Sequence, residues 1–221
     1  KTITPRIKDS LPDFTEDGIP DSFFEDVSDI TIVACGTAMY AGMVGKTMIQ
    51  NRLHIPVTVA IASEFRYEEP VISDKSMVVF VSQSGETIDT LEALRLANKY
   101  TKKTLSIVNV KGSSIARESN YVLYTHAGPE IAVASTKAYT VQAASFYLLG
   151  CKLGLVSGKM TEADAKEFIE NLQEVPNLIE SAITQAPEIE QLTKRMVNAT
   201  NAFYIGRGLD YTLCMEGCLL Y

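Results

Sequence analysis

The sequence predicts an α/β protein, in which a parallel sheet of about five strands is covered by helices on both faces. Residues 77–81 form an apolar run without alternation, which is typical of a strand buried on both faces. Ile88, Leu91 and Leu94 then recur at helical spacing. Strand-like and helix-like segments alternate along the chain, and this order favours right-handed crossovers between parallel strands.

The individual elements follow from short apolar runs separated by helical patterns. The runs predicted as strands are 30–34, 57–62, 77–81, 104–110 and 121–125. The predicted helices between and after them are 39–52, 88–97, 113–118 and a long helix that ends near residue 153.

Changes in composition divide the chain into four parts. Residues 1–29 are polar, are broken by prolines and lack periodicity, so we expect an arm or linker. The sheet domain is expected at 30–157, and a helical connector at 158–200, with Pro176 and Pro187 as interruptions. Residues 201–221 repeat the pattern of the first strand and turn, with an apolar strand at 202–205, a polar turn and then the start of a helix, so we expect a second, truncated copy of the domain to begin there.

Composition excludes several classes of protein. The 221 residues are 46% hydrophobic and carry a net charge of -7, which argues against a nucleic-acid surface. Neither a membrane span of ~18 apolar residues nor a signal pattern is present, so we expect a cytoplasmic protein. Cys214 and Cys218 lie one helical turn apart, but a zinc site needs two more ligands and both histidines are distant. We therefore expect no metal and reduced, packed thiols.

The turn from Ser82 to Thr87 is the strongest candidate site. It joins a central strand to a helix, where unpaired backbone N–H groups and the helix dipole favour an anion. The turn lacks both the lysine of a nucleotide-binding P-loop and a GxGxxG pattern, so its neutral donors suit a single phosphate monoester. An ordinary serine-capped helix without a ligand remains the alternative, and Glu86 would repel an anion unless it points away.

Two further turns with hydroxyl groups also follow predicted strands. Thr37 follows the first strand, and Ser135 precedes the long helix after the fifth strand. The carboxyl ends of parallel strands meet at one edge of a sheet, so all three turns are expected on a common rim.

Five motifs together resemble the sugar isomerase (SIS) half of the glutamine-fructose-6-phosphate aminotransferase family. The resemblance runs from about residue 30 to residue 221. The motifs are ACGT at 34–37, ASEFRY at 62–67, SQSGET at 82–87, EI with ASTKA at 130–138, and GRG with EG at 206–217.

The resemblance implies two flavodoxin-like αβα domains that form one isomerase unit, fed with ammonia by an upstream glutaminase domain, in a dimeric enzyme. It implies that fructose 6-phosphate is converted to glucosamine 6-phosphate by general acid and base groups, without a metal or organic cofactor. The residues implied to bind the phosphate are Ser82, Gln83, Ser84 and Thr87. Those implied near the sugar are Thr37, Val133 and Ser135.

The chain departs from the family pattern at several positions. The family's catalytic glutamate, histidine and lysine are expected beyond Tyr221, so no catalytic residue is assigned within this chain. Leu220 stands where the family usually has a lysine, Ala38 replaces a common serine, and Ala132 a common glycine. A fructosamine-phosphate deglycase and a sugar-phosphate-sensing regulator would use the same phosphate-binding turn, and both remain alternatives.

Overall fold

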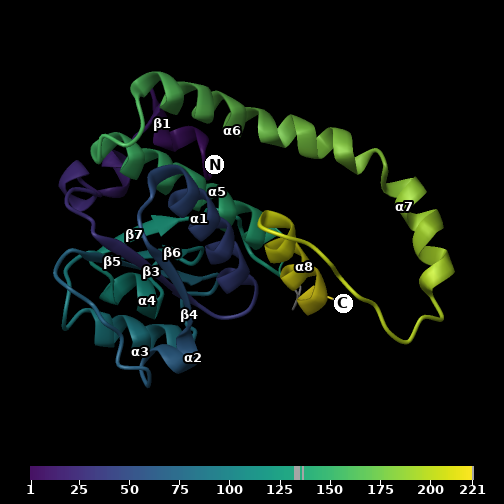
Figure 1. The fold of residues 1–221 in the computed structure, drawn as a ribbon, viewed down its shortest axis with the longest axis horizontal. Coiled ribbons are helices and arrows are strands. Elements are labelled where there is room, and N and C mark those ends of the chain that lie inside the picture. The colour runs from purple at the N-terminus through teal and green to yellow at the C-terminus, as the bar shows by residue number, and fades with distance from the viewer. Residues whose placement is uncertain (132–134, 136, 221) are drawn as a thin grey trace.

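A five-stranded parallel sheet forms the centre of the protein, as the sequence predicts. We describe a computed structural model that covers residues 1–131, 135 and 137–220. The strand order is β4-β3-β5-β6-β7, and every neighbouring pair is parallel (Figure 1). This order is that of flavodoxin-like folds, so the predicted fold class is confirmed. The strands are β3 (Asp29–Ala34), β4 (Val57–Ile61), β5 (Ser76–Ser82), β6 (Thr104–Val108) and β7 (Tyr121–Tyr124).

Helices cover both faces of the sheet. One face packs on α1 (Thr37–Leu53) and α5 (Lys137–Val156), and the other on α2 (Ala62–Phe65), α3 (Ile88–Ala97) and α4 (Ser114–Glu118) (Figure 1). Successive residues of a strand point to opposite faces, so Ile32 lies in the core with α1 and α5, and Val33 in the core with α3. β5 is buried along its whole length. The expected αβα sandwich is therefore complete.

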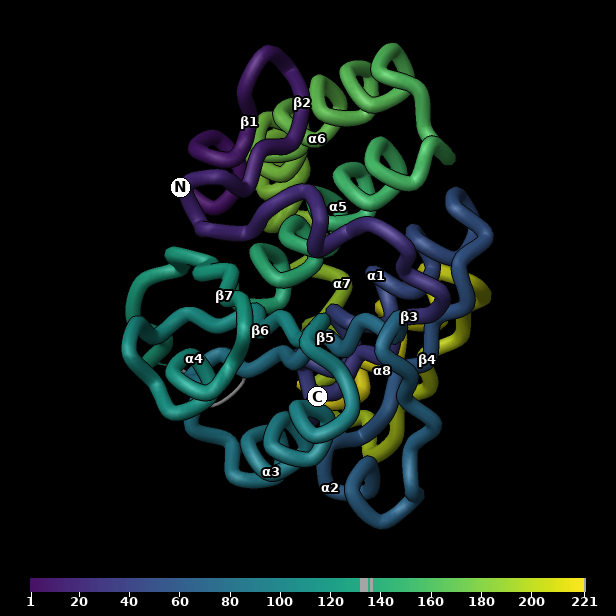
Figure 2. The backbone as a smooth tube through the Cα atoms, turned by 90° about the vertical axis from the view of Figure 1, so that its left-hand side faces the viewer, coloured from purple at the N-terminus to yellow at the C-terminus, as the bar shows by residue number. Residues whose placement is uncertain are grey.

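The first 29 residues are packed against the domain, which differs from the expected arm or linker. They form a short hairpin of β1 (Ile7–Lys8) and β2 (Leu11–Pro12) with 3-10 turns at Thr4–Arg6, Thr15–Asp17 and Asp21–Phe23. Phe14, Phe23 and Phe24 are buried in the same core as Ile30. The backbone of this segment runs beside α5 (Figure 2). Irregular segments bury isolated aromatic residues without a helical or strand period, so sequence periodicity gave no signal here.

Pro176 does not interrupt the connector where the sequence predicts a break. Helix α6 runs continuously over Glu162–Ile183, with Pro176 inside it. A capping box at Thr161 and the burial of Ile169 and Leu172 hold the turns before the proline. The prolyl ring removes one hydrogen bond on an exposed stretch, where water can satisfy the freed carbonyl. Pro187 lies in the first turn of α7 (Ala186–Thr193), where proline is tolerated, and a 3-10 turn at Lys194–Met196 follows.

The predicted strand at 202–205 is not formed. These residues have no strand pairing, and the side chains of Phe203 and Ile205 are more than nine-tenths exposed. A strand exists only when hydrogen-bonded to a neighbour, and none of the described residues pairs with this segment. The helix predicted to follow is present as α8 (Leu209–Leu220), which packs against α1 (Figure 1).

The four cysteines are free thiols in different environments, and this predicts their order of reaction. Burial raises the pKa of Cys151 to about 11, whereas Cys218 is exposed. Because the thiolate is the nucleophile, iodoacetamide at pH 8 is expected to label Cys218 in the folded protein and to spare Cys151 until urea unfolds the chain. Peptide mass mapping measures both. Equal labelling of the two in the folded protein would contradict the packing described here.

Two classes of feature are not found within the part of the chain that the structure describes. None of its helices is both long and apolar enough to cross a membrane. No group of three or more His, Cys, Asp or Glu side chains is placed there to hold a metal ion.

Candidate functional site at the rim of the sheet

A cavity of about 410 Å³ opens at the carboxyl ends of β3 and β5. The chain leaves β3 toward β4 on one side and leaves β5 toward β6 on the other, so the strand order reverses at this point. Ligands of open α/β sheets bind at such a switch point, and the volume is in the usual range of small-molecule sites, about 300–1,000 Å³. The turns after both strands line the cavity, together with residues of α5 and α8.

The serine turn is held by its own hydroxyl groups. The Oγ of buried Ser82 accepts a hydrogen bond from the backbone N–H of Gly85 at 3.0 Å and shares another with the Thr87 hydroxyl at 3.0 Å. Ser84 Oγ accepts from the backbone N–H of Glu86 at 3.2 Å. Ser82 thus shapes the turn, and the hydroxyl groups of Ser84 and Thr87 line the cavity at the N-terminus of α3.

Glu86 points away from the cavity, so its negative charge does not face an anion bound there. Its Oε1 accepts a hydrogen bond of 2.8 Å from the backbone N–H of Ser114, the first residue of α4. This bond holds the pKa of Glu86 below its ordinary value. The carboxylate therefore lies at the positive end of another helix and leaves the cavity to the neutral donors of its own turn.

A second helix N-terminus meets the cavity at α1. Thr37 is the first residue of that helix and lines the cavity, and its hydroxyl donates a hydrogen bond of 3.0 Å to Oε1 of Glu216 on α8. Burial raises the pKa of the Glu216 carboxyl, an effect that the bond from Thr37 opposes. The N-termini of α1 and α3 thus both line the cavity, and their dipoles favour an anion in it.

The third predicted turn reaches the same cavity. Ser135 lines it, and its hydroxyl donates to Oε2 of Glu130 at 3.2 Å. The structure therefore brings together six of the seven residues named from the sequence, which are Thr37, Ser82, Gln83, Ser84, Thr87 and Ser135. The seventh, Val133, lies outside the described residues.

Sequence reasoning missed two residues of the cavity wall, Gln142 on α5 and Leu219 on α8. An amide between apolar neighbours in a long helix was the only signal for Gln142. Leu219 is brought in by the packing of α8, and its Cδ2 lies 3.8 Å from where a Cβ on Gly36 would stand. Leu220, at the position of the family's usual lysine, also lines the cavity and leaves an apolar wall there.

Comparison with known proteins identifies the fold family. Residues 23–151, more than half of the chain, match the SIS domain family. The chain belongs to the SIS domain family. The matched region of this SIS chain contains all the strands of the parallel sheet and the six cavity residues that the sequence predicts to bind the sugar phosphate.

Relatives of the SIS chain share a common name. It is 45% identical over 195 residues to glutamine--fructose-6-phosphate aminotransferase [isomerizing] of Caldanaerobacter subterraneus and 43% identical over 219 residues to that of Leifsonia xyli. These alignments cover 88% and 99% of this chain, which spans about a third of either relative, 32% and 36%. The solved C-terminal domain of glucosamine-fructose-6-phosphate aminotransferase from Francisella tularensis superposes with a TM-score of 0.94 at 36% identity, covering 99% of this chain and 62% of that one.

Proposed function

We propose that this SIS chain is the sugar-phosphate-binding part of the isomerase region of a glutamine-fructose-6-phosphate aminotransferase. The full enzyme would make glucosamine 6-phosphate from fructose 6-phosphate and ammonia released from glutamine. The observation that carries the proposal is the cavity at the switch point, where Ser84, Thr87 and two helix N-termini offer uncharged donors to one anion. The relatives named above support the same activity.

Within that reaction we assign binding, and no proton transfer, to the residues named here. Ser82, Gln83, Ser84 and Thr87 hold the phosphate, while Thr37, Val133 and Ser135 lie near the sugar. We expect the catalytic glutamate, histidine and lysine outside this chain, so the chain alone should bind the substrate without converting it.

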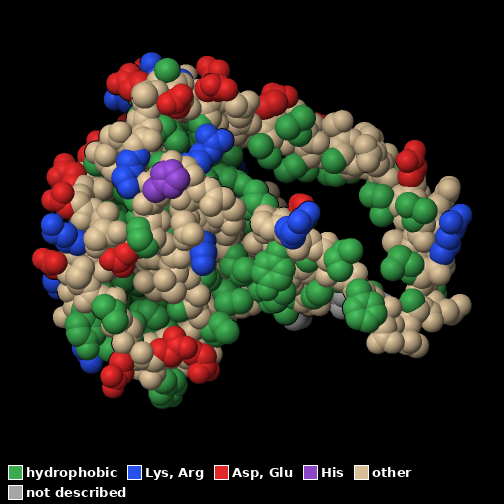
Figure 3. All heavy atoms as spheres, viewed as in Figure 1, with side chains coloured by type: hydrophobic (Ala, Val, Ile, Leu, Met, Phe, Trp, Pro, Cys, Tyr) green, Lys and Arg blue, Asp and Glu red, His purple; other side chains and the backbone are tan. Residues whose placement is uncertain are grey.

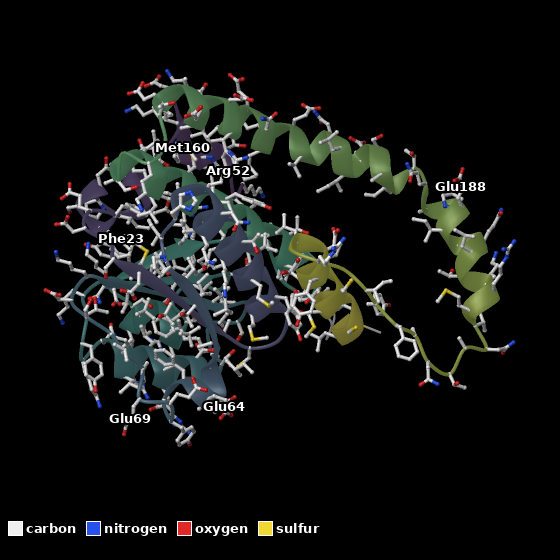
Figure 4. All side chains as sticks on the ribbon, viewed as in Figure 1. Phe23, Arg52, Glu64, Glu69, Met160 and Glu188 are labelled. Atoms are coloured by element: carbon white, nitrogen blue, oxygen red, sulfur yellow. The ribbon has the colours of Figure 1, made fainter. Side chains whose placement is uncertain are left out.

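We also propose that 201–221 begins a second SIS domain, with 30–157 as the first and 158–200 as the connector. The extended apolar segment at Phe203 and Ile205 would then be a central strand that lacks its neighbours here. Figure 3 shows hydrophobic side chains along the side of α6 and α7 that faces α8, and Glu188 marks how far α7 lies from the sheet (Figure 4). The strongly exposed apolar residues of α6 and α7 are Leu178, Ile183, Ile189 and Leu192, and such side chains are suited to packing against a further domain.

We propose the domain arrangement and oligomeric state that the family resemblance implies. A glutaminase domain would precede this region in the full-length protein and supply ammonia, and two copies would form a homodimer. Free thiols at all four cysteines support a reducing, cytoplasmic location.

Isothermal titration calorimetry tests the proposed ligand class directly. We expect fructose 6-phosphate to bind and fructose to bind far more weakly, because the two helix N-termini and the serine turn act on the phosphate alone. Equal affinity for the two sugars would refute the assignment of the phosphate site.

The contribution of one hydroxyl is expected to be measurable. Replacing Ser84 by alanine should weaken the binding of fructose 6-phosphate by about 1–2 kcal/mol, since one hydrogen bond to a charged oxygen is lost. Ser63→Ala is the matched control, because Ser63 lies on α2 outside the cavity and should leave the affinity unchanged. Unchanged affinity in Ser84→Ala would place the phosphate elsewhere.

A further inference from the structure

The side-chain amide oxygen of Gln142 is a buried polar atom on the wall of the cavity. Only 1% of the residue is exposed, and Oε1 has no hydrogen-bond partner among the residues that the structure describes. Buried polar atoms in folded proteins are almost always paired, so an unpaired carbonyl oxygen needs an explanation. Three other described residues, Thr90, Ser113 and Glu216, also have a buried side-chain oxygen without a hydrogen-bond partner, but none of the three lines the cavity.

The chemistry of the amide oxygen restricts what can bind it. A carbonyl oxygen only accepts hydrogen bonds, and so do the oxygens of a fully ionised phosphate monoester. The phosphate held by the serine turn therefore cannot satisfy Gln142 Oε1. A ligand that satisfies both the serine turn and Gln142 Oε1 needs a donor group, such as a hydroxyl, in addition to its phosphate.

The donors for the phosphate and the acceptor for a hydroxyl come from different elements of the cavity lining. Ser84 and Thr87, at the start of α3, provide donors for an anion, whereas Gln142 comes from the second turn of α5, a different element of the cavity lining. A volume of about 410 Å³ leaves room for more than a phosphate group.

We propose that Gln142 is a specificity-determining residue that accepts a hydrogen bond from a hydroxyl group of the sugar, and so distinguishes a polyol phosphate from phosphate itself. This inference rests on the proposed function, because it assigns a role to the non-phosphate part of the same ligand. A hydroxyl both donates and accepts, so it can also pair with the NH₂ group of the amide.

Gln142→Met tests the role, because methionine has a similar length and lacks both polar atoms. We expect calorimetry to show about a tenfold loss of affinity for fructose 6-phosphate and no more than about a twofold change for inorganic phosphate. The thermal midpoint of the unliganded variant should stay the same or rise, since an unpaired buried polar group has been removed. Gln173→Met, at an exposed position on α6, is the matched control and should change neither affinity.

The outcomes separate the two proposals. A wild-type chain that binds neither probe would overturn the proposed function, and with it this inference. A wild-type chain that prefers fructose 6-phosphate, with the same preference in Gln142→Met, would overturn only the role of Gln142. Parallel losses of both affinities and of thermal stability would show that Gln142 is merely structural.

A second measurement needs no substitution and covers the case in which the variant does not fold. The ¹⁵N side-chain amide signal of Gln142 is expected to shift when fructose 6-phosphate is added and to stay in place with inorganic phosphate. A signal that responds equally to both probes, or to neither while fructose 6-phosphate binds, would contradict the proposed contact.

Discussion

Replacing Gly85 by alanine is expected to lower the free energy of unfolding by about 2–5 kcal/mol and to abolish measurable binding of fructose 6-phosphate. Gly85 has φ +68°, a conformation that costs an L-residue roughly 1–2 kcal/mol. A Cβ there would lie 2.0 Å from Ser113 Oγ and 2.5 Å from Ser113 Cβ, and overpacking of this kind costs about 1–3 kcal/mol more. Relief of the contact would move the serine turn that shapes the cavity.

Urea denaturation of the Gly85→Ala and Gly112→Ala variants distinguishes the cost of backbone strain from the cost of overpacking against Ser113. Gly112 has φ +71°, but a Cβ there meets nothing within 4 Å, so only the backbone cost of about 1–2 kcal/mol is expected. Adding Ser113→Gly to Gly85→Ala should restore part of the lost stability, because it removes both clashing atoms. Equal losses in Gly85→Ala and Gly112→Ala would show that the close approach to Ser113 does not matter.

Replacing Asp17 by alanine is expected to cost about 3–5 kcal/mol, because it leaves the buried guanidinium of Arg6 without its countercharge. Nε and Nη2 of Arg6 donate to the Asp17 carboxylate at 2.7 and 2.6 Å, and Nη2 also donates to the backbone carbonyl of Tyr124 at 2.9 Å. The side chains of Arg6 and Asp17 are only 4% and 12% exposed. The pair thus joins the N-terminal segment to the end of β7.

An exposed arginine–carboxylate pair with similar distances serves as the control for Asp17→Ala. Arg95 donates to both oxygens of Glu118 at 2.7 and 2.6 Å, but these side chains are 47% and 35% exposed. Glu118→Ala is therefore expected to cost less than about 1 kcal/mol. Urea melts of both variants measure the difference, and a loss in Asp17→Ala as small as that in Glu118→Ala would mean that the N-terminal segment is only loosely attached.

The regular elements of the sheet domain could be predicted because each has a local signal. The uninterrupted, largely β-branched apolar run of β5 is typical of a strand covered on both faces, and the helical spacing after it indicates α3. The same local signals predict that Thr37, Ser84 and Ser135 lie on one rim, since the carboxyl ends of parallel strands meet at the same edge of the sheet.

The remaining features depend on contacts between segments that are distant in the sequence. The burial of Phe14 and Phe24 in the main core and the continuity of α6 through Pro176 have no periodic signal. The segment at Phe203 has a local signal without the structure. Its apolar pattern predicts a strand, but a strand forms only when a neighbour pairs with it.

The sequence alone therefore determined the parallel sheet and the hydroxyl-bearing turns at its rim, and it predicts that those turns prefer a phosphate monoester. Only the tertiary structure decided that Glu86 turns to α4, that α8 brings Glu216 to Thr37, and that Gln142 lies unpaired on the cavity wall. The physical reason is that hydrophobic periodicity and turn chemistry act over a few residues, whereas the direction and pairing of a side chain depend on whichever distant element packs beside it.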